Sequence, residues 1–210
     1  MSIFIDSADP IEVQKACELG WVKGVTTNPI LVQRAGGDPD VLLEALASFE
    51  LGPLYYQLTA KDEKGMEQEA RRVLDIVGES LVLKIPPTTS GYNFVHHYHD
   101  EFQCCITALF SPIQAMAAQE VGAQEVVVYV HRATQQRGNG VQLVKDVREI
   151  LAYGNVSLLA ASIKSSKEAG MAFLAGAQHV TAGLSVLENL IKDEFSLQAL
   201  NQFNRDGIGI

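Results

Sequence analysis

The chain has 210 residues, of which 47% are hydrophobic and 20% are charged, a composition typical of a globular protein and unlike that of a disordered one. The 16 Lys and Arg residues against 25 Asp and Glu residues give a formal net charge of -9. This charge argues against nucleic acid or an anionic membrane as the main partner. An anionic ligand would therefore need a local cationic site.

The cysteines and the apolar runs indicate a cellular compartment. Cys17, Cys104 and Cys105 are an odd number without a CxxC spacing, so a disulfide framework is not expected and a reducing environment is favoured. The first residues lack the basic segment of a secretion signal, and no apolar run approaches the roughly 18 residues of a membrane helix. The sequence therefore predicts a cytoplasmic protein.

Short apolar runs of strand type alternate with helical patterns along the chain. The expected strands cover residues 3–6, 24–27, 54–58, 81–86, 102–108, 126–130, 157–161 and 179–181. Asp9-Pro10 and Asp38-Pro39 are typical helix starts, with an N-cap followed by proline, and Thr89-Ser90 is a further candidate cap. A glycine-bearing loop is expected over residues 136–140 and a last helix over residues 196–203.

Eight consecutive strand–helix units favour a (β/α)8 (TIM) barrel, with an open doubly wound sheet as the alternative. We therefore expect an α/β protein with one domain over residues 1–210, in which residues 196–210 add a C-terminal helix and tail. In such a barrel the carboxyl ends of all strands surround one mouth, where catalytic groups gather.

Lys84 is the unusual residue of the fourth strand, because it stands among Leu81, Val82, Leu83 and Ile85. A strand of this kind is expected to be buried on both faces, so its ammonium needs water, a partner or a chemical role. Desolvation disfavours the charged form of lysine, and a neutral amine can attack a carbonyl carbon to form a Schiff base. The alternative is a lysine whose stem packs while its ammonium reaches solvent.

Polar residues stand within or just after the other strands. They are Asp6, Thr26, Asn28, Gln57, Thr107, Tyr129 and Ser162. Each alone has an ordinary structural explanation as a cap, a turn residue, a strand residue or a satisfied core amide. In a barrel they would converge on the mouth around Lys84.

Four segments resemble the signature segments of the transaldolase family and occur in the family's order over most of the chain. They are Phe4-Ile5-Asp6-Ser7-Ala8-Asp9, Gly24-Val25-Thr26-Thr27-Asn28-Pro29, Val82-Leu83-Lys84-Ile85-Pro86 and Ala160-Ala161-Ser162-Ile163-Lys164. The overall length resembles the short branch, which contains fructose-6-phosphate aldolase and small bacterial transaldolases. The resemblance implies a (β/α)8 barrel, a Schiff-base lysine on the fourth strand, and no metal or other cofactor.

The resemblance implies catalytic roles for five residues. Lys84 would attack the ketose carbonyl, and Asp6 would bind a substrate hydroxyl and assist proton transfer during cleavage. The water that shuttles protons to and from the Schiff base would be positioned by Gln57, Thr107 and Tyr129.

Five further residues would bind the substrate, a small sugar phosphate. Thr26 and Asn28 would hold its dihydroxyacetone part. Its phosphate would be bound by Arg132 and Ser162, together with Lys164. A guanidinium suits this role because it can pair with two phosphate oxygens at once.

Two positions point to a reaction within the family. Gln57 and Tyr129 resemble the aldolase branch, since longer transaldolases have glutamate and phenylalanine there. The expected reaction is the reversible cleavage of fructose 6-phosphate to dihydroxyacetone and glyceraldehyde 3-phosphate. The alternatives are transaldolase transfer of the dihydroxyacetone unit and, from another class, a non-catalytic sugar-phosphate-binding barrel. Val127 departs from the family, which usually has alanine or serine beside the donor ketose.

The last predicted helix bears on assembly. Leu197, Leu200 and Phe203 have helical spacing, yet this helix lies beyond the eight units of the barrel. Similar short family members exchange a C-terminal helix between neighbours in ring-shaped oligomers. The resemblance thus implies a homo-oligomer of pentameric rings, or a decamer.

A metal site is a further alternative. Its ligands would be His96, His97, His99, Cys104 and Cys105. Histidines at neighbouring helix positions point apart, and no pair here has a recognised zinc spacing, so an exposed helix end is the favoured interpretation.

Overall fold

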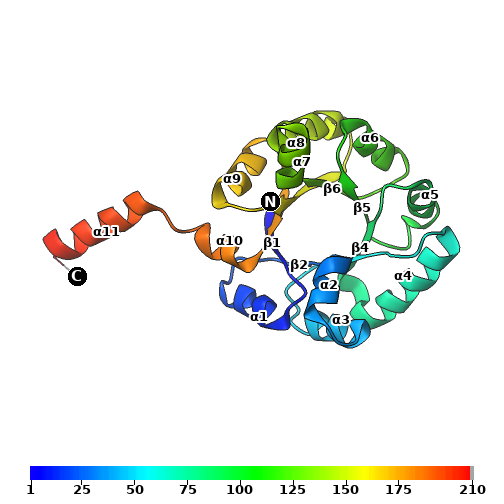
Figure 1. Cartoon of the computed structure of the whole chain (residues 1–210), viewed down its shortest axis with the longest axis horizontal. Coiled ribbons are helices and arrows are strands. Elements are labelled where there is room, and N and C mark those ends of the chain that lie inside the picture. The colour runs from blue at the N-terminus through cyan, green and yellow to red at the C-terminus, as the bar shows by residue number, and fades with distance from the viewer. Residues whose placement is uncertain (209–210) are drawn as a thin grey trace.

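The structure is a computed structural model that describes residues 1–208. Eight parallel strands form a closed barrel in chain order, which confirms the (β/α)8 barrel and excludes the open sheet (Figure 1). The strands are β1 (Ser2–Asp6), β2 (Val25–Thr26), β3 (Leu54–Gln57), β4 (Leu81–Ile85), β5 (Cys104–Leu109), β6 (Glu125–Tyr129), β7 (Ser157–Ile163) and β8 (His179–Ala182).

Helices surround the barrel, and the last one extends away from it (Figure 1). They are α1 (Pro10–Glu18), α2 (Pro29–Ala35), α3 (Pro39–Ala47), α4 (Glu63–Val77), α5 (Thr89–Tyr98), α6 (Pro112–Glu120), α7 (Val130–Arg137), α8 (Gly140–Ile150), α9 (Ser166–Leu174), α10 (Leu184–Asn189) and α11 (Glu194–Asp206). Two 3-10 turns are η1 (Gly78–Ser80) and η2 (Leu151–Tyr153). No helix within residues 1–208 is long and apolar enough to cross a membrane.

The predicted helix starts follow the capping chemistry. Asp9 and Asp38 cap α1 and α3 with their side chains, and each is followed by proline at the first helical position. The predicted cap at Thr89-Ser90 is wrong by one residue, because the hydroxyl of Thr88 accepts the hydrogen bond from the Gly91 amide.

The chain after β6 differs from the prediction. Residues 136 and 137 belong to α7, so the loop expected over residues 136–140 is shorter than predicted. Helix α7 begins directly after Tyr129 and ends at Gly138, whose φ of 87° lies in the left-handed region that favours glycine. This direct strand-to-helix connection puts Arg132 in the first turn of α7.

Alternate strand residues face the barrel interior or the surrounding helices. Phe4 and Val127 belong to a cluster of buried residues inside the barrel, whereas their neighbours Ile5, Val126 and Val128 belong to the core under the helices. Lys84 has the same parity as the inward-facing Val82. The period-two pattern therefore points Lys84 into the barrel.

The C-terminal segment begins earlier than predicted. Helix α11 starts at Glu194, two residues before the expected start at residue 196, because Asp193 accepts hydrogen bonds from the amides of Phe195 and Ser196. The expected tail extends to residue 210, and residues 209–210 lie outside the described residues.

Candidate active site

A cavity of about 510 Å³ opens at the carboxyl ends of the strands. Most of the predicted site residues line it together: Asp6, Asn28, Gln57, Lys84, Tyr129, Arg132, Ser162 and Lys164. Thr26 and Thr107 do not line the cavity. They are buried and contact Asp6 and Tyr129, respectively.

Lys84 reaches the cavity from inside the barrel. It is 4% exposed, and its register partners are Gln57 on β3 and Cys105 on β5. The Nζ atom donates a hydrogen bond to the Thr27 carbonyl oxygen at 2.7 Å. The interpretation in which the ammonium reaches solvent is therefore wrong, and the amine has one fixed partner beside the cavity.

Asp6 is held by Thr26, which in turn contacts Thr181. The Thr26 hydroxyl donates to Oδ1 of Asp6 at 2.9 Å, and it lies 2.7 Å from the Thr181 hydroxyl. If Thr26 donates to Asp6, Thr181 donates to Thr26, so this chain of hydrogen bonds is directed at the carboxylate. Thr26 was expected to contact substrate, whereas here it orients Asp6.

Asn28 caps a helix and also lines the cavity. Its side-chain oxygen caps α2 by accepting hydrogen bonds from the amides of Ile30 and Leu31 at 3.0 and 3.1 Å. The side-chain NH2 group of Asn28 is not used in this cap, and Asn28 lines the cavity, so this group can donate a hydrogen bond to a ligand. This donor suits a carbonyl or hydroxyl oxygen of a sugar.

Tyr129 lies between a hydroxyl and a cation. Its hydroxyl is 3.4 Å from that of Thr107, close to the limit of a hydrogen bond. The Arg132 guanidinium stands 4.9 Å from the centre of the Tyr129 ring, and the Phe110 ring meets it edge-on at 6.0 Å. These contacts fix the ring, so the phenol is held at the cavity wall.

Two backbone irregularities turn residues into the cavity. The register shifts between β5 and β6 and between β7 and β8, and Ala108 and Ser162 at these places each have a φ of 58°. A non-glycine residue with positive φ is uncommon and is often found at functional sites. Ser162 consequently lines the cavity beside Lys164.

Hydrogen bonds tie the elements that carry the predicted phosphate-binding residues. Nδ1 of His131 on α7 lies 2.7 Å from Oε1 of Glu168 on α9, and the other Glu168 oxygen accepts from the Lys164 amide at 2.7 Å. Arg132 and Lys164 are thus connected through His131 and Glu168. His131 has no role in the prediction from the sequence.

Sequence reasoning missed Arg34, which also lines the cavity. It stands in the last turn of α2, six positions after Asn28. A basic residue in a last helical turn is common for its effect on the helix dipole, so nothing in the sequence pattern assigns Arg34 to a site.

Val127 does not line the cavity. Its side chain is fully buried in the cluster inside the barrel. The departure from the family at this position is therefore not at the cavity surface.

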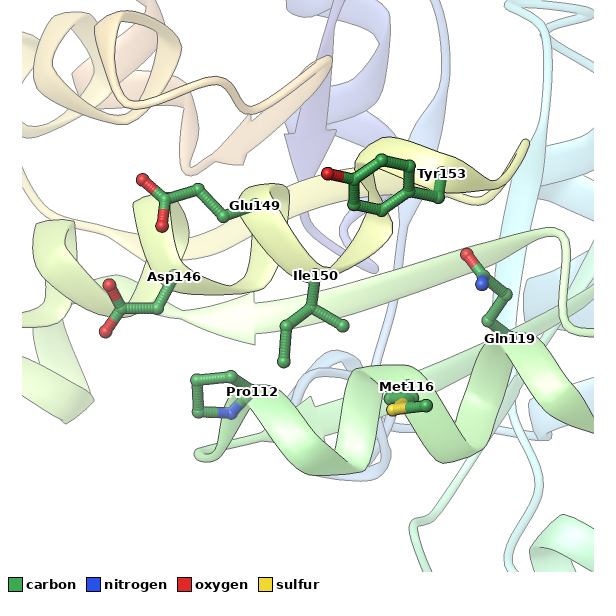
Figure 2. A pocket seen from close by; sticks show the side chains of 7 residues that line it. All are labelled: Pro112, Met116, Gln119, Asp146, Glu149, Ile150 and Tyr153. Atoms are coloured by element: carbon green, nitrogen blue, oxygen red, sulfur yellow. The ribbon is translucent and has the colours of Figure 1, made fainter.

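Two other hollows contrast with this cavity. A groove of about 590 Å³ lies between α6 and α8, and its lining includes Met116, Asp146, Glu149, Ile150 and Tyr153. Figure 2 shows these side chains. The groove offers no cation or amine for a phosphorylated carbonyl compound. A second hollow, of about 260 Å³, lies at the amino ends of the strands and includes Glu125 and His179.

The alternative metal site is not formed. Within residues 1–208, no group of three or more His, Cys, Asp or Glu residues could hold a metal ion. His97 instead pairs with Glu63 at 2.6 Å, and Cys104 and Cys105 are fully buried.

Residues 3–206 match the family model described as Transaldolase/Fructose-6-phosphate aldolase. The chain belongs to this family. Relatives include a "Probable transaldolase" of Halalkalibacterium halodurans, which is 32% identical over 98% of both chains. Another "Probable transaldolase", from an Anaeromyxobacter species, is 35% identical over 98% of this chain and 97% of its own.

Solved structures of other enzymes share only the fold. A mandelate oxidase structure has a TM-score of 0.65 at 18% identity, covering 99% of this chain and 73% of its own. At this identity the likeness supports the barrel architecture and no activity. Aldolase or transaldolase activity follows from membership of the Transaldolase/Fructose-6-phosphate aldolase family.

Proposed function

We propose that this family member is a Schiff-base (class I) aldolase that reversibly cleaves fructose 6-phosphate to dihydroxyacetone and glyceraldehyde 3-phosphate. The observation that carries the proposal is the buried Lys84 amine at the wall of a cavity that also contains Asp6 and Arg132. A nucleophile, a carboxylate and a phosphate-binding cation are the groups that this reaction needs.

The proposed reaction begins at Lys84. Its amine attacks the C2 carbonyl of the ketose, and loss of water gives a protonated Schiff base. Asp6 takes the proton of the C4 hydroxyl as the C3–C4 bond breaks, and the electron pair passes to the Schiff-base nitrogen. Glyceraldehyde 3-phosphate leaves, the resulting enamine is protonated at C3, and water hydrolyses the Schiff base to release dihydroxyacetone.

The other lining residues support binding and proton transfer. The NH2 group of Asn28 is available to the dihydroxyacetone part, while Arg132, Ser162 and Lys164 are available to the phosphate. Gln57, and Tyr129 backed by Thr107, would hold the water that exchanges protons with the Schiff base. The phenol of Tyr129 favours cleavage over transfer because it can assist hydrolysis of the imine.

Transaldolase activity is the second candidate. It shares every step up to the enamine, which then attacks an aldose phosphate instead of being protonated. The names of the relatives favour this reaction, and it would place the protein in pentose phosphate metabolism.

Product analysis separates the two candidates and tests both. The enzyme is incubated with fructose 6-phosphate, with and without erythrose 4-phosphate, and the products are identified. An aldolase releases dihydroxyacetone without the acceptor, whereas a transaldolase makes sedoheptulose 7-phosphate and needs the acceptor. A sugar-phosphate-binding barrel would do neither.

We further propose that the protein is a homo-oligomer, with pentameric rings as the expected unit. Every residue of α11 is exposed or only half-buried, and Phe195, Leu197, Leu200 and Phe203 are each more than half exposed. Within residues 1–208, this apolar face packs against no part of its own barrel, as the position of α11 in Figure 1 illustrates. A monomer in light scattering at micromolar concentration would contradict the proposal.

A further inference from the structure

The predicted phosphate-binding residues come from two separate segments of the chain. Arg132 lies in the first turn of α7, whereas Ser162 lies near the end of β7 and Lys164 lies in the loop before α9. All three line the cavity. A phosphate group that contacts both segments at once is bound well only if their separation is fixed, because small displacements of the contacting groups weaken such a site.

A histidine and a glutamate outside the cavity lining join these two segments. Nδ1 of His131, the residue before Arg132, lies 2.7 Å from Oε1 of Glu168 in the first turn of α9. Oε2 of Glu168 accepts a hydrogen bond from the backbone amide of Lys164, also at 2.7 Å. One carboxylate therefore holds α7 through one oxygen and the β7–α9 loop through the other.

Helix capping accounts for only one of these two contacts. Ser165 is the N-cap of α9, and its hydroxyl accepts a hydrogen bond from the Glu168 amide. A glutamate three residues after such a cap commonly accepts a hydrogen bond from the backbone at the start of the helix, and the bond from the Lys164 amide fits this pattern. The contact with His131 joins another helix and adds nothing to the cap, so it needs a different explanation.

The imidazole of His131 is held at both of its nitrogens. A carboxylate can only accept, so Nδ1 carries the proton and donates to Glu168. Nε2 lies 3.0 Å from Nε2 of Gln135 on the same helix, whose amide can donate to an unprotonated ring nitrogen. The side chains of His131 and Glu168 are 33% and 22% exposed, and neither lines the cavity. They can therefore act on a ligand only through their neighbours.

We propose that His131 and Glu168 are positioning residues for the substrate phosphate. By linking α7 to the β7–α9 loop, they hold Arg132 at a separation from Ser162 and Lys164 that lets all three contact one phosphate group. The proposal rests on the aldolase function proposed above. The phosphate is remote from the bond that breaks and is bound equally in the ground state and the transition state, so loss of the link should raise KM and leave kcat unchanged.

The chain contains a matched control for this link. Nδ1 of His97 on α5 lies 2.6 Å from Oε1 of Glu63 on α4. This contact uses the same two atoms as that between His131 and Glu168 and also joins two helices, but neither residue lines the cavity. His97→Ala therefore removes the same kind of contact without changing the predicted phosphate site.

The test measures KM and kcat for addition of dihydroxyacetone to glyceraldehyde 3-phosphate and to unphosphorylated glyceraldehyde. In His131→Ala, KM for glyceraldehyde 3-phosphate should rise about threefold to tenfold, whereas KM for glyceraldehyde and kcat with either aldehyde should stay within about twofold of the wild type. His131→Asn keeps an N–H donor near the position of Nδ1 and should restore most of the affinity. His97→Ala should behave as the wild type does.

Two further measurements test the link itself. Glu168→Ala should raise KM for glyceraldehyde 3-phosphate at least as much as His131→Ala does, and combining the two substitutions should raise it no further, because the contact is already lost. Binding of inorganic phosphate, measured by calorimetry, needs no turnover and should weaken about threefold to tenfold in His131→Ala. It should not weaken in His97→Ala.

An equal rise of KM for both aldehydes in His131→Ala, or no rise for either, would overturn the proposal. Increases that multiply in the double variant, or a similar effect in His97→Ala, would also overturn it. Borohydride trapping of dihydroxyacetone on Lys84 tests the aldolase function separately. If the wild type forms this adduct and converts both aldehydes while His131→Ala shows no selective loss, only the role of His131 and Glu168 is wrong. If the wild type forms neither adduct nor product, the aldolase function is wrong, and the binding of inorganic phosphate decides the role of His131 and Glu168.

Discussion

Lys84 and Glu125 are two charged residues buried in the same barrel, one near each end. Lys84 is 4% exposed and Glu125 is 6% exposed. Lys84 borders the cavity at the carboxyl ends of the strands, whereas Glu125 borders the smaller hollow at their amino ends. In barrels of this kind, chemistry is found at the carboxyl ends and residues at the amino ends serve stability.

The two residues also differ in their surroundings. Lys84 has one hydrogen bond, to the Thr27 carbonyl oxygen, and shares its cavity with an acid and several cations. Glu125 accepts from the Ser157 hydroxyl at 3.0 Å, and its second carboxyl oxygen is buried without a partner. Burial raises the pKa of Glu125, an effect that the nearby Tyr55 and Ser157 hydroxyls oppose. Burial of a charge is therefore not by itself a mark of catalysis.

Replacing Lys84 gives the largest expected effect. Lys84→Met should reduce kcat by about 10⁴-fold or more, since Lys84 is the buried amine at the cavity wall, whereas Lys164, the other lysine that lines the cavity, is exposed. Glu125→Gln should keep kcat within about threefold of the wild type, because an exchange at the amino end leaves the cavity intact. Steady-state cleavage of fructose 6-phosphate measures both. A comparable decrease of kcat in the two variants would contradict the assignment of catalysis to the carboxyl ends of the strands.

Arg132 should control selection of phosphorylated substrates. Arg132→Ala should lower kcat/KM for glyceraldehyde 3-phosphate in the aldol direction by about tenfold to a hundredfold, because a charge-assisted pair is lost. Unphosphorylated glyceraldehyde should be affected far less. Initial rates with the two aldehydes measure this difference, and the variant Lys145→Gln on α8 is the control for the loss of one positive charge. A similar decrease for both aldehydes would remove Arg132 from phosphate binding.

Tyr129→Phe should shift the balance between release and transfer. The variant keeps the ring that packs against Phe110 and Arg132 but loses the hydroxyl near Thr107. Losing one hydrogen bond to the relay water should slow release of dihydroxyacetone roughly tenfold. The enamine then lives longer and meets an acceptor more often. The ratio of transfer to cleavage, measured with erythrose 4-phosphate present, should rise; an unchanged ratio would leave Tyr129 as a packing residue.

The smallest expected effect concerns pH and Glu125. Because burial raises the pKa of this carboxyl in the folded protein, its contribution to stability is complete below its ordinary value of 4.5 and is lost as pH rises through the higher folded value. The groups around it include Tyr55, Lys84, Cys105 and His179. Thermal unfolding from pH 4 upward should show this loss in the wild type and a smaller loss in Glu125→Gln. About 2–4 °C in Tm corresponds to each kcal/mol in a chain of this size. If the Tm of the wild type and of Glu125→Gln changed equally with pH, ionisation of the Glu125 carboxyl would not destabilise the fold, which would contradict this prediction.

Much of the fold could be predicted from local patterns. Eight apolar runs separated by helical segments specify the barrel, and the pairs Asp9-Pro10 and Asp38-Pro39 mark helix starts through chemistry that acts within a few residues. Lys84 stood out because a cation interrupts an apolar strand. The strand ends then predicted most of the polar residues that line the cavity, Thr26 and Thr107 being the exceptions.

The rest depends on contacts that no local pattern encodes. The burial of Thr26 below Asp6, and of Thr107 beside Tyr129, follows from the register between strands. Arg34 reaches the cavity because α2 lies near the mouth, and His131 meets Glu168 because α7 and α9 are neighbours. Strand β6 begins at Glu125, one residue before the start predicted from the sequence, so the prediction did not include Glu125 in the strand. Its inward direction could therefore not be predicted.

Covalent trapping tests the central claim most directly. The protein is incubated with dihydroxyacetone, reduced with borohydride, digested and analysed by mass spectrometry, with Lys84→Met as the control. The account predicts the mass of a reduced dihydroxyacetone adduct on Lys84 in the wild type and on no lysine in Lys84→Met. An adduct on a different lysine, or active enzyme that carries no adduct, would contradict it.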